Sequence, residues 1–218
     1  GHAMDEWYLA QWAGVSPQTG LPLWYTDESR TTTTTDFSQA KRVWTGASAT
    51  PKITSGLALH ADWRGIYLNA NLHLVAGHKI MNTYFEDFYN DAASQLQFFR
   101  GIAGQYRNTW TRPGDNAKMP VLASGHNHNG SKSQSDRFLR RGDYIRFREL
   151  TIGYDLPKNV LDRIHFHGAI GVYAQVTNLF TYKFDKRLDY DPEVSPQGRW
   201  EFTNPATRTF SLGLNVKF

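Results

Sequence analysis

Three groups of side chains in this sequence carry atoms that could do chemistry, and none of the three is complete. His126 and His128 offer two imidazoles to a metal, but no third ligand is evident, and the glycine, serine and asparagine around them are typical of a loop. Glu86 and Asp87, with Asp91 nearby, have the composition of a glycosidase acid pair, yet closeness in sequence does not fix the separation that such carboxylates need. The sequence also lacks the motifs of serine hydrolases, zinc proteases and phosphate-binding loops. We therefore expect no enzymatic activity, no catalytic residue, no metal site and no cofactor.

The third group consists of Asp189, Asp191 and Glu193, whose carboxylates fall at alternate positions around Pro192. Carboxylate oxygens are the ligands that calcium prefers, but the glycine and the spacing of an EF-hand loop are missing. Two interpretations remain open, a solvated acidic turn and a loop stabilised by a bound ion. Neither of them predicts a signalling site.

Four aromatic residues outside the predicted strands are the candidate ligand-binding residues: Trp24, Tyr25, Trp110 and Trp200. Their flat apolar faces with a polar handle suit stacking on sugar rings or packing on a protein partner. The alternative is that they pack loops against one another or lie in the aromatic girdle of a membrane protein. Both interpretations remain open.

Strands are the elements that would position these groups. Residues 208–218 read RTFSLGLNVKF, in which apolar and polar side chains alternate strictly to the last residue. A period of two over a whole segment indicates a strand with one apolar and one polar face, and a tilted membrane-crossing strand needs roughly 9 to 11 residues. Similar runs over 57–63 and 66–74 flank Arg64-Gly65, which predicts a tight hairpin.

Two further strands are predicted over 166–178 and 143–154. The first has a regular period of two. In the second, the apolar residues change phase part of the way along. We therefore expect a β-bulge near Arg148 and Glu149 that shifts the register by one residue.

The connections between the predicted strands alternate in length. Short links at Arg64-Gly65 and 155–163 fall on one side of an up-and-down sheet, and long links over 77–142 and 179–207 fall on the other. Outer-membrane barrels have this arrangement, with short periplasmic turns and long extracellular loops. Five strands, with a sixth candidate within 6–15, are too few to close a barrel, which needs about 8. Either the rest of the barrel lies outside this sequence, or the chain is a soluble protein.

Composition narrows the class of protein further. The 218 residues include 7 Trp, 11 Tyr and 13 Phe, a mixture that suits strands and turns. No apolar run approaches the length of a transmembrane helix. The net charge of +4 is spread along the chain, so nucleic-acid binding is not indicated. The absence of cysteine removes thiol and disulfide chemistry and suits an exported bacterial protein.

Two stretches of the sequence are specific enough to carry a family resemblance. They are SDRFLRRGDYIRFRELTIGYDLP over 135–157 and VYAQVTNLFTY over 172–182, and 11–25, 50–56 and the terminal strand support them in the same order. Together the five stretches resemble the C-terminal quarter of SusC/RagA-type TonB-dependent outer-membrane transporters of Bacteroidetes. Ser16 stands where the family often carries Asp.

The resemblance implies an all-β fold, in which antiparallel up-and-down strands form part of a large transmembrane β-barrel of about 22 strands with long extracellular loops. It implies that residues 5–218 are a C-terminal segment without the plug domain and most strands, while residues 1–4 resemble a tag remnant. Arg146 and Arg148 face the lumen by strand phase, and we expect them to pair with plug carboxylates.

For the whole protein, the resemblance implies a place in the cell outer membrane, in contact with outer-membrane lipid. It also implies import of oligomeric nutrients, either glycans or peptides, with a SusD-like surface lipoprotein and a TonB complex that acts through the missing N-terminal part. The alternative is a secreted carbohydrate-binding β-sandwich with aromatic loops. The two differ in whether the apolar faces of 57–74, 170–176 and 210–218 point towards lipid or into one shared core.

Overall fold

The computed structural model describes residues 1–82, 108–122, 128–131, 133–188, 190–199 and 204–218. The chain divides into two compact units. We call residues 51–77, 141–193 and 204–218 the strand unit, and residues 1–50, 78–140 and 194–203 the loop unit.

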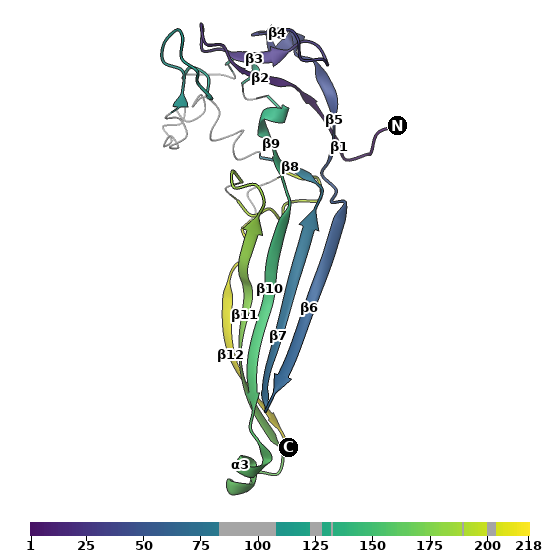
Figure 1. Cartoon of the computed structure of the whole chain (residues 1–218), viewed down its shortest axis with the longest axis vertical. Coiled ribbons are helices and arrows are strands. Elements are labelled where there is room, and N and C mark those ends of the chain that lie inside the picture. Colours follow the sequence, from purple (N-terminus) through teal and green to yellow (C-terminus); the bar gives the residue numbers. More distant parts are fainter. Residues whose placement is uncertain (83–107, 123–127, 132, 189, 200–203) are drawn as a thin grey trace. The chain divides into compact units, whose positions relative to one another are not determined.

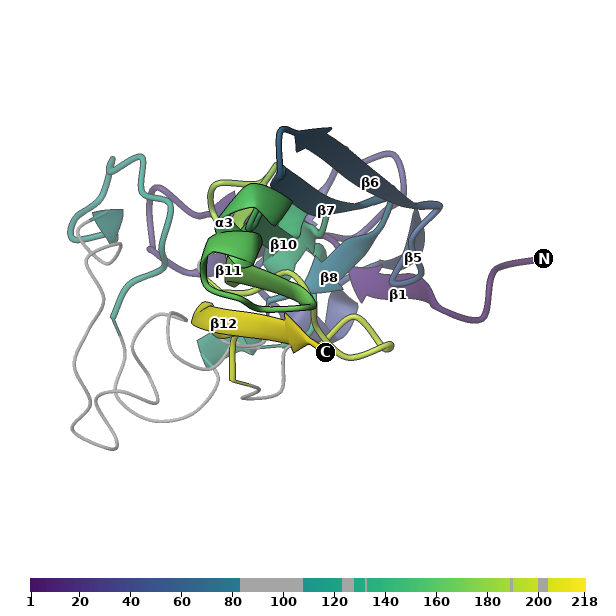
Figure 2. The ribbon, with the colours of Figure 1, turned by 90° about the horizontal axis from the view of Figure 1, so that it is seen from below.

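The strand unit contains a five-stranded sheet in the order β12-β11-β10-β7-β6 (Figure 1). Its strands are β6 (Ile53–Trp63), β7 (Ile66–Ala76), β10 (Tyr144–Asp155), β11 (Ala169–Lys183) and β12 (Thr209–Lys217). Every neighbouring pair is antiparallel, and the spatial order follows the chain. In the view along the strands, β6 and β12 lie at opposite edges of this sheet (Figure 2). The structure thus confirms the predicted antiparallel up-and-down fold.

Both short links lie at one end of the sheet. Arg64 and Gly65 have φ angles of 50° and 86°, and a two-residue hairpin turn of type I′ needs positive φ at both positions. The link from β10 to β11 contains the short helix α3 (Lys158–Arg163). The ring of Phe218 lies 5.7 Å from that of Phe166, which places the last residue of the chain at this same end.

The predicted β-bulge lies where the sequence places it. Phe147 pairs with Leu72 and Glu149 with Asn71, so β10 has one residue more than β7 at this point. The same two residues of β10 pair with Phe180 and Thr177 of β11, so β11 has one more again. At this level of the sheet, β10 therefore has one residue more than β7, and β11 has one residue more than β10.

Two predictions about strands need correction. The strand expected over 166–178 begins at Ala169 and continues to Lys183, because Phe180 and Tyr182 keep the apolar phase beyond Asn178. The sixth membrane strand proposed within 6–15 is wrong. That segment forms two short strands that pair elsewhere, and it buries Trp7 and Leu9 in a core of the loop unit, as a strand in water does.

The loop unit consists of short strands and turns. Two of its sheets are pairs, β1 (Glu6–Ala10) with β5 (Arg42–Ser48) and β8 (Lys79–Met81) with β9 (Leu139–Arg141). A third sheet has three strands, in which β3 (Pro22–Tyr25) lies between β2 (Trp12–Val15) and β4 (Thr33–Thr34). Its described 3-10 helices are η1 (Phe37–Gln39), η3 (His128–Gly130) and η4 (Asp136–Phe138). The core cluster contains Trp7, Leu9, Ala49, Met81 and Phe138. Among the described residues, no helix is both long and apolar enough to cross a membrane.

Candidate functional site

The two faces of the five-stranded sheet differ in chemistry. Because residues directly opposite each other on neighbouring strands share a face, the register defines rows that cross the whole sheet. One row consists of Leu59, Ala70, Leu150, Val176 and Phe210, and the next row on the same face consists of Ala61, Leu68, Ile152, Ala174 and Leu212. The row between them points the other way and consists of His60, Asn69, Thr151, Gln175 and Ser211. We call these the apolar face and the polar face.

The apolar face is exposed in this chain. Leu212 is 89% exposed, and Leu59, Ile152 and Phe210 are exposed as well. Aromatic side chains lie towards both ends of this face. Trp63 and Tyr154 lie at the short-link end, and Phe180 and Tyr182 lie near the other. An apolar band between two aromatic girdles is the pattern of a strand wall in a membrane.

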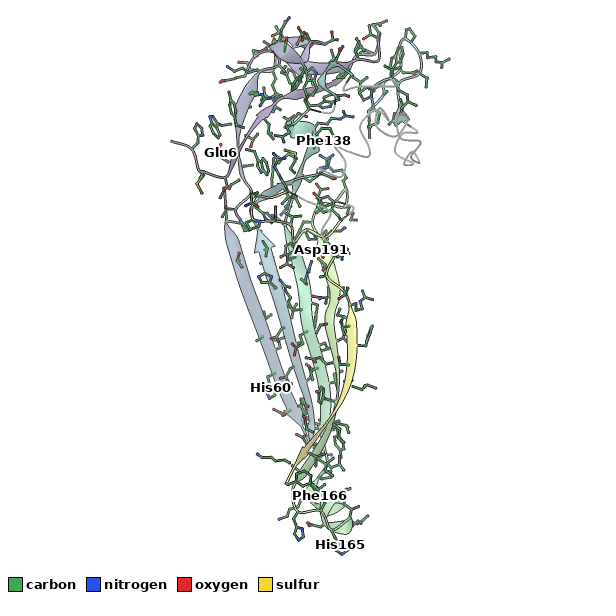
Figure 3. All side chains as sticks on the ribbon, turned by 180° about the vertical axis from the view of Figure 1, so that it is seen from behind. Glu6, His60, Phe138, His165, Phe166 and Asp191 are labelled. Carbon is green, nitrogen blue, oxygen red and sulfur yellow. The ribbon has the colours of Figure 1, made fainter. Side chains whose placement is uncertain are left out.

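A cluster of opposite charges lies on the polar face near the long-loop end of β10. The guanidinium of Arg146 donates from Nη1 to Glu193 Oε2 at 2.8 Å and from Nη2 to a carboxylate oxygen of Asp191. Arg148 donates from Nη2 to Glu193 Oε1 at 2.7 Å. Asp191 lies at the end of the sheet opposite Phe166 and His165 (Figure 3). We call Arg146, Arg148, Asp191 and Glu193 the ion cluster.

The β-bulge explains why one short stretch of β10 supplies so many charges to one face. With strict alternation, Phe147 and Glu149 would share the apolar face. The extra residue at the bulge changes the phase, so that Glu149 pairs with Asn71 and Thr177 on the polar face. Arg148 also reaches the polar face, where its Nη2 lies 3.4 Å from His73 Nδ1. The bulge thus keeps all these charges off the apolar face.

The two carboxylates of the ion cluster are held differently. Asp191 also accepts hydrogen bonds from the backbone N–H groups of Glu193, at 2.9 Å, and Ala206, at 3.2 Å. Its side chain is 15% exposed, whereas that of Glu193 is 41% exposed. Among the described residues, the Glu193 carboxylate bonds to the two arginines. Asp191 therefore organises its own loop, while Glu193 bridges Arg146 and Arg148.

These contacts bear on two expectations about charged groups. Arg146 and Arg148 face the predicted side of the sheet, and within this chain they already have carboxylate partners, Asp191 and Glu193. The expected pairing with plug carboxylates stays a prediction. Asp191 and Glu193 act as counter-ions of arginines, which neither interpretation of the acidic group anticipated. Asp189 lies outside the described residues. In the described part of the chain, no group of three or more potential metal ligands is found.

Sequence reasoning missed the partnership within the ion cluster, although a signal was present. Arg146 and Arg148 are spaced by two residues, and so are Asp191 and Glu193. Two pairs with equal spacing and opposite charge can meet when one lies on a strand face and the other on a loop above it. The long connection from β11 to β12 provides that loop.

The candidate aromatic residues occupy three different environments. Trp24 is fully buried, its ring packs against Trp12 and Phe37, and its indole N–H donates to the carbonyl of Asn129 at 2.9 Å. No face of this ring is left for a ligand in this structure. Tyr25 is half-buried and carries the guanidinium of Arg30 at 5.8 Å from its ring centre.

Trp110 is half-buried and packs on a glycine of the loop unit. A Cβ at Gly20, where φ is +71°, would lie 2.5 Å from the indole, so only glycine admits this contact. The indole N–H of Trp110 donates to the carbonyl of Pro17 at 2.9 Å. Trp200 lies outside the described residues, as do His126 and the acidic residues Glu86, Asp87 and Asp91.

The exposed apolar face, the aromatic residues at its two ends and the polar opposite face together define part of the wall of a transmembrane β-barrel. Among the described residues, β6 and β12 each pair on one side only, so the wall is open at both edges.

Comparison with known proteins shows which barrel proteins this chain is similar to. The chain is 25% identical over 169 residues to TonB-dependent receptor P39 of Formosa agariphila, and 24% identical over 184 residues to TonB-dependent receptor P3 of the same organism. These matches cover 75% and 78% of this chain, but 16% of each receptor. No family model matches the chain.

Solved structures agree with this result at the level of the fold. The structure of the RagAB peptide importer in the open-open state matches with a TM-score of 0.78 and 23% identity, over 98% of this chain and 22% of that chain. The closed-closed state matches with a TM-score of 0.78 and 24% identity, over 98% of this chain and 23% of that chain. The resemblance to SusC/RagA-type TonB-dependent transporters is thereby confirmed, and the chain spans less than a quarter of the proteins it matches.

Proposed function

We propose that this chain forms part of the wall of an outer-membrane TonB-dependent transporter that imports oligomeric nutrients. The observation that carries this proposal is the apolar face of the five-stranded sheet, on which many large side chains are exposed, together with the likeness to TonB-dependent receptors. In water, so much exposed apolar surface would drive association. In a bilayer, the same face is solvated by lipid, which is then a direct partner of the chain.

The proposed partners and substrate are supported by the resemblance. A SusD-like surface lipoprotein would assist in capture, and a TonB complex would act through a plug domain outside residues 5–218. The solved neighbours are described as a peptide importer, which favours oligopeptides over glycans as the substrate. Within the loop unit, Tyr25 and Trp110 keep partly accessible rings and remain candidates for contacts with the substrate or the lipoprotein.

The alternative of a secreted carbohydrate-binding β-sandwich requires one shared core. In a sandwich, the apolar faces of its two sheets bury each other. Here Leu59, Ile152 and Leu212 are exposed on one side of a single sheet. This exposure favours the transporter over the sandwich. The proposed role is therefore transport rather than catalysis.

The test is to express the full-length parent with its native leader and to locate it in cell fractions. We expect recovery in the outer membrane, and a compact band on an unheated gel that shifts on boiling, as a closed barrel gives. A periplasmic protein from the same cells provides the control for fractionation. Recovery of the parent as a soluble protein in the periplasm or medium would contradict the proposal.

Transport itself needs a second experiment. Cells that lack the gene should fail to grow on oligopeptides as the sole nitrogen source, and complementation should restore growth only when TonB is present. Growth on oligosaccharides instead would assign a glycan substrate. Growth that is independent of TonB would contradict the energy-coupled mechanism.

A further inference from the structure

We infer that Arg146 and Arg148 form a binding site for a carboxylate group of the transported molecule, and that Glu193 occupies this site when no ligand is bound. This inference rests on the proposed function, because it places a substrate beside the polar face of the sheet. The ligand chemistry is a carboxylate, which an oligopeptide carries at its C-terminus or on acidic side chains and which an acidic glycan carries as a uronate.

The geometry around Glu193 is that of a bound carboxylate. Its Oε2 accepts from Arg146 at 2.8 Å and its Oε1 accepts from Arg148 at 2.7 Å, so each oxygen contacts a different guanidinium. Charge-assisted hydrogen bonds of this length are the strong ones in proteins. The two arginines are presented by one rigid strand, which fixes their spacing independently of the loop that carries Glu193.

The exposed fractions of the four side chains divide the ion cluster into a fixed half and an accessible half. Arg146 is fully buried and Asp191 is 15% exposed, so their bond is shielded from solvent. Arg148 is 38% exposed and Glu193 is 41% exposed, so their bond can be reached from solvent. A carboxylate in solution can therefore approach the position of Glu193 without disturbing Asp191.

The other hydrogen bonds of Asp191 and Glu193 also indicate that Asp191 is fixed and that Glu193 can be displaced. Asp191 accepts two backbone N–H groups of its own loop, and its displacement would break that loop. Within the described part of the loop and sheet, the Glu193 carboxylate bonds to the two arginines. When a ligand carboxylate displaces the Glu193 side chain, one carboxylate takes the place of another. The charges of the two arginines therefore stay neutralised.

Glu193 should act as an internal competitor. Its loop holds it near the arginines at an effective concentration on the order of millimolar, so a ligand must bring contacts of its own to displace it. The apparent affinity for the ligand is reduced by the fraction of sites that Glu193 fills. Removal of the charge at position 193 should therefore strengthen binding of carboxylates and leave binding of uncharged analogues unchanged.

The experiment measures binding of three probes to the purified full-length parent at low ionic strength. The probes are penta-alanine with a free C-terminal carboxylate, penta-alanine amide, and trigalacturonate. We expect Glu193→Gln to bind the free-acid peptide about tenfold more tightly than the wild type does, with no change for the amide. The double variant E193Q/R148Q should lose the gain. Tighter binding of trigalacturonate instead of the free-acid peptide would support the site and assign a uronate as the ligand.

The controls separate this inference from a purely structural role and from failure of the proposed function. Lys186→Gln removes a positive charge from an exposed residue of the same loop and should leave all affinities unchanged. Glu193→Asp keeps the charge but shortens the side chain, so it should give part of the gain even if E193Q folds poorly. Equal binding of acid and amide by both Glu193 variants would overturn the inference, even if the loop became more sensitive to protease. A parent recovered outside the outer membrane would overturn the proposed function, whatever the probes do.

Discussion

Trp24 and Trp63 are the same residue type in opposite settings. Trp24 lies in the loop unit, is fully buried and donates its indole N–H to a backbone carbonyl. Trp63 ends β6 in the strand unit and is 66% exposed, with the guanidinium of Arg64 at 5.0 Å from its ring centre. Trp24 is buried as an aromatic core residue is in water, and Trp63 is exposed at the end of its strand as an aromatic residue is at a membrane interface.

The strand unit repeats this contrast within a single sheet. Leu212 is almost fully exposed, whereas Arg146 is fully buried, which reverses the usual distribution in water. Burial of this charge is tolerated because the carboxylates of Asp191 and Glu193 neutralise it. This reversal is the pattern expected of a sheet whose apolar face meets hydrocarbon and whose polar face holds its own counter-ions.

The largest expected effect tests the contrast between the two tryptophans. Trp24→Ala should destabilise the loop unit by about 3–5 kcal/mol, since it empties a packed site between Trp12 and Phe37. Trp63→Ala should cost less than about 1 kcal/mol, because the ring is exposed. Hydrogen exchange of the β2 and β3 amides in the full-length parent measures the first effect, and equal losses in the two variants would contradict the contrast.

The next prediction tests the two faces with neighbouring residues of β11. Val176→Arg puts a charge in the middle of the apolar face and should cost about 2–4 kcal/mol. Gln175→Arg puts the same charge on the polar face and should cost less than about 1 kcal/mol. The fraction of heat-modifiable, membrane-inserted parent measures both. Similar yields would mean that the two faces meet the same solvent.

A smaller effect concerns a cross-strand contact on the polar side of the sheet. Gly153 pairs with Tyr67, and a Cβ at Gly153 would lie 2.1 Å from the tyrosine Cζ. Gly153→Ala should cost about 1–3 kcal/mol through overpacking. Gly56→Ala is the matched control, because its Cβ would meet no atom closer than 3.9 Å. Thermal unfolding of the parent compares them, and Tyr67→Ala should relieve the cost of Gly153→Ala.

The smallest effect is a pH dependence in the loop unit. Burial raises the pKa of Asp136, although its carboxylate accepts the backbone N–H of Trp12 at 2.7 Å. A carboxyl group whose pKa is raised by folding favours the folded state most when it is protonated, so its contribution is lost as the pH rises through the folded pKa. Wild type should therefore gain stability relative to Asp136→Asn as the pH is lowered from neutral towards the unfolded pKa. A difference that stays constant with pH would show that burial does not perturb this group.

Period-two patterns predicted the strand unit well because each of its strands has one apolar and one polar face. The hairpin at Arg64-Gly65 and the bulge at Arg148 were both confirmed, since a turn residue and a change of phase are local signals. Two features were not predictable in this way: the burial of Trp24, and the folding of residues 6–15 into two short strands of the loop unit. Both depend on packing between segments far apart in the chain, such as the contact of Trp24 with Asn129.

The ion cluster shows the same limit of sequence reasoning. Strand phase correctly predicted that Arg146 and Arg148 lie on the polar face. It does not predict which loop packs against that face. The carboxylates that neutralise them lie more than forty residues further along the chain, at separations of 45 and 47 residues. Such a partnership follows from the path of the connection between β11 and β12 and has no local signature.

The most direct test of the account is cysteine labelling along β11 in the full-length parent in outer membranes. The sequence contains no cysteine, so a single substitution introduces the first thiol into this segment. At successive positions from Val172 to Thr177, we expect a water-soluble maleimide to label Tyr173→Cys, Gln175→Cys and Thr177→Cys and to leave the three alternate positions unlabelled. Labelling without alternation, or labelling of the apolar positions in preference, would contradict a sheet that separates lipid from a polar interior.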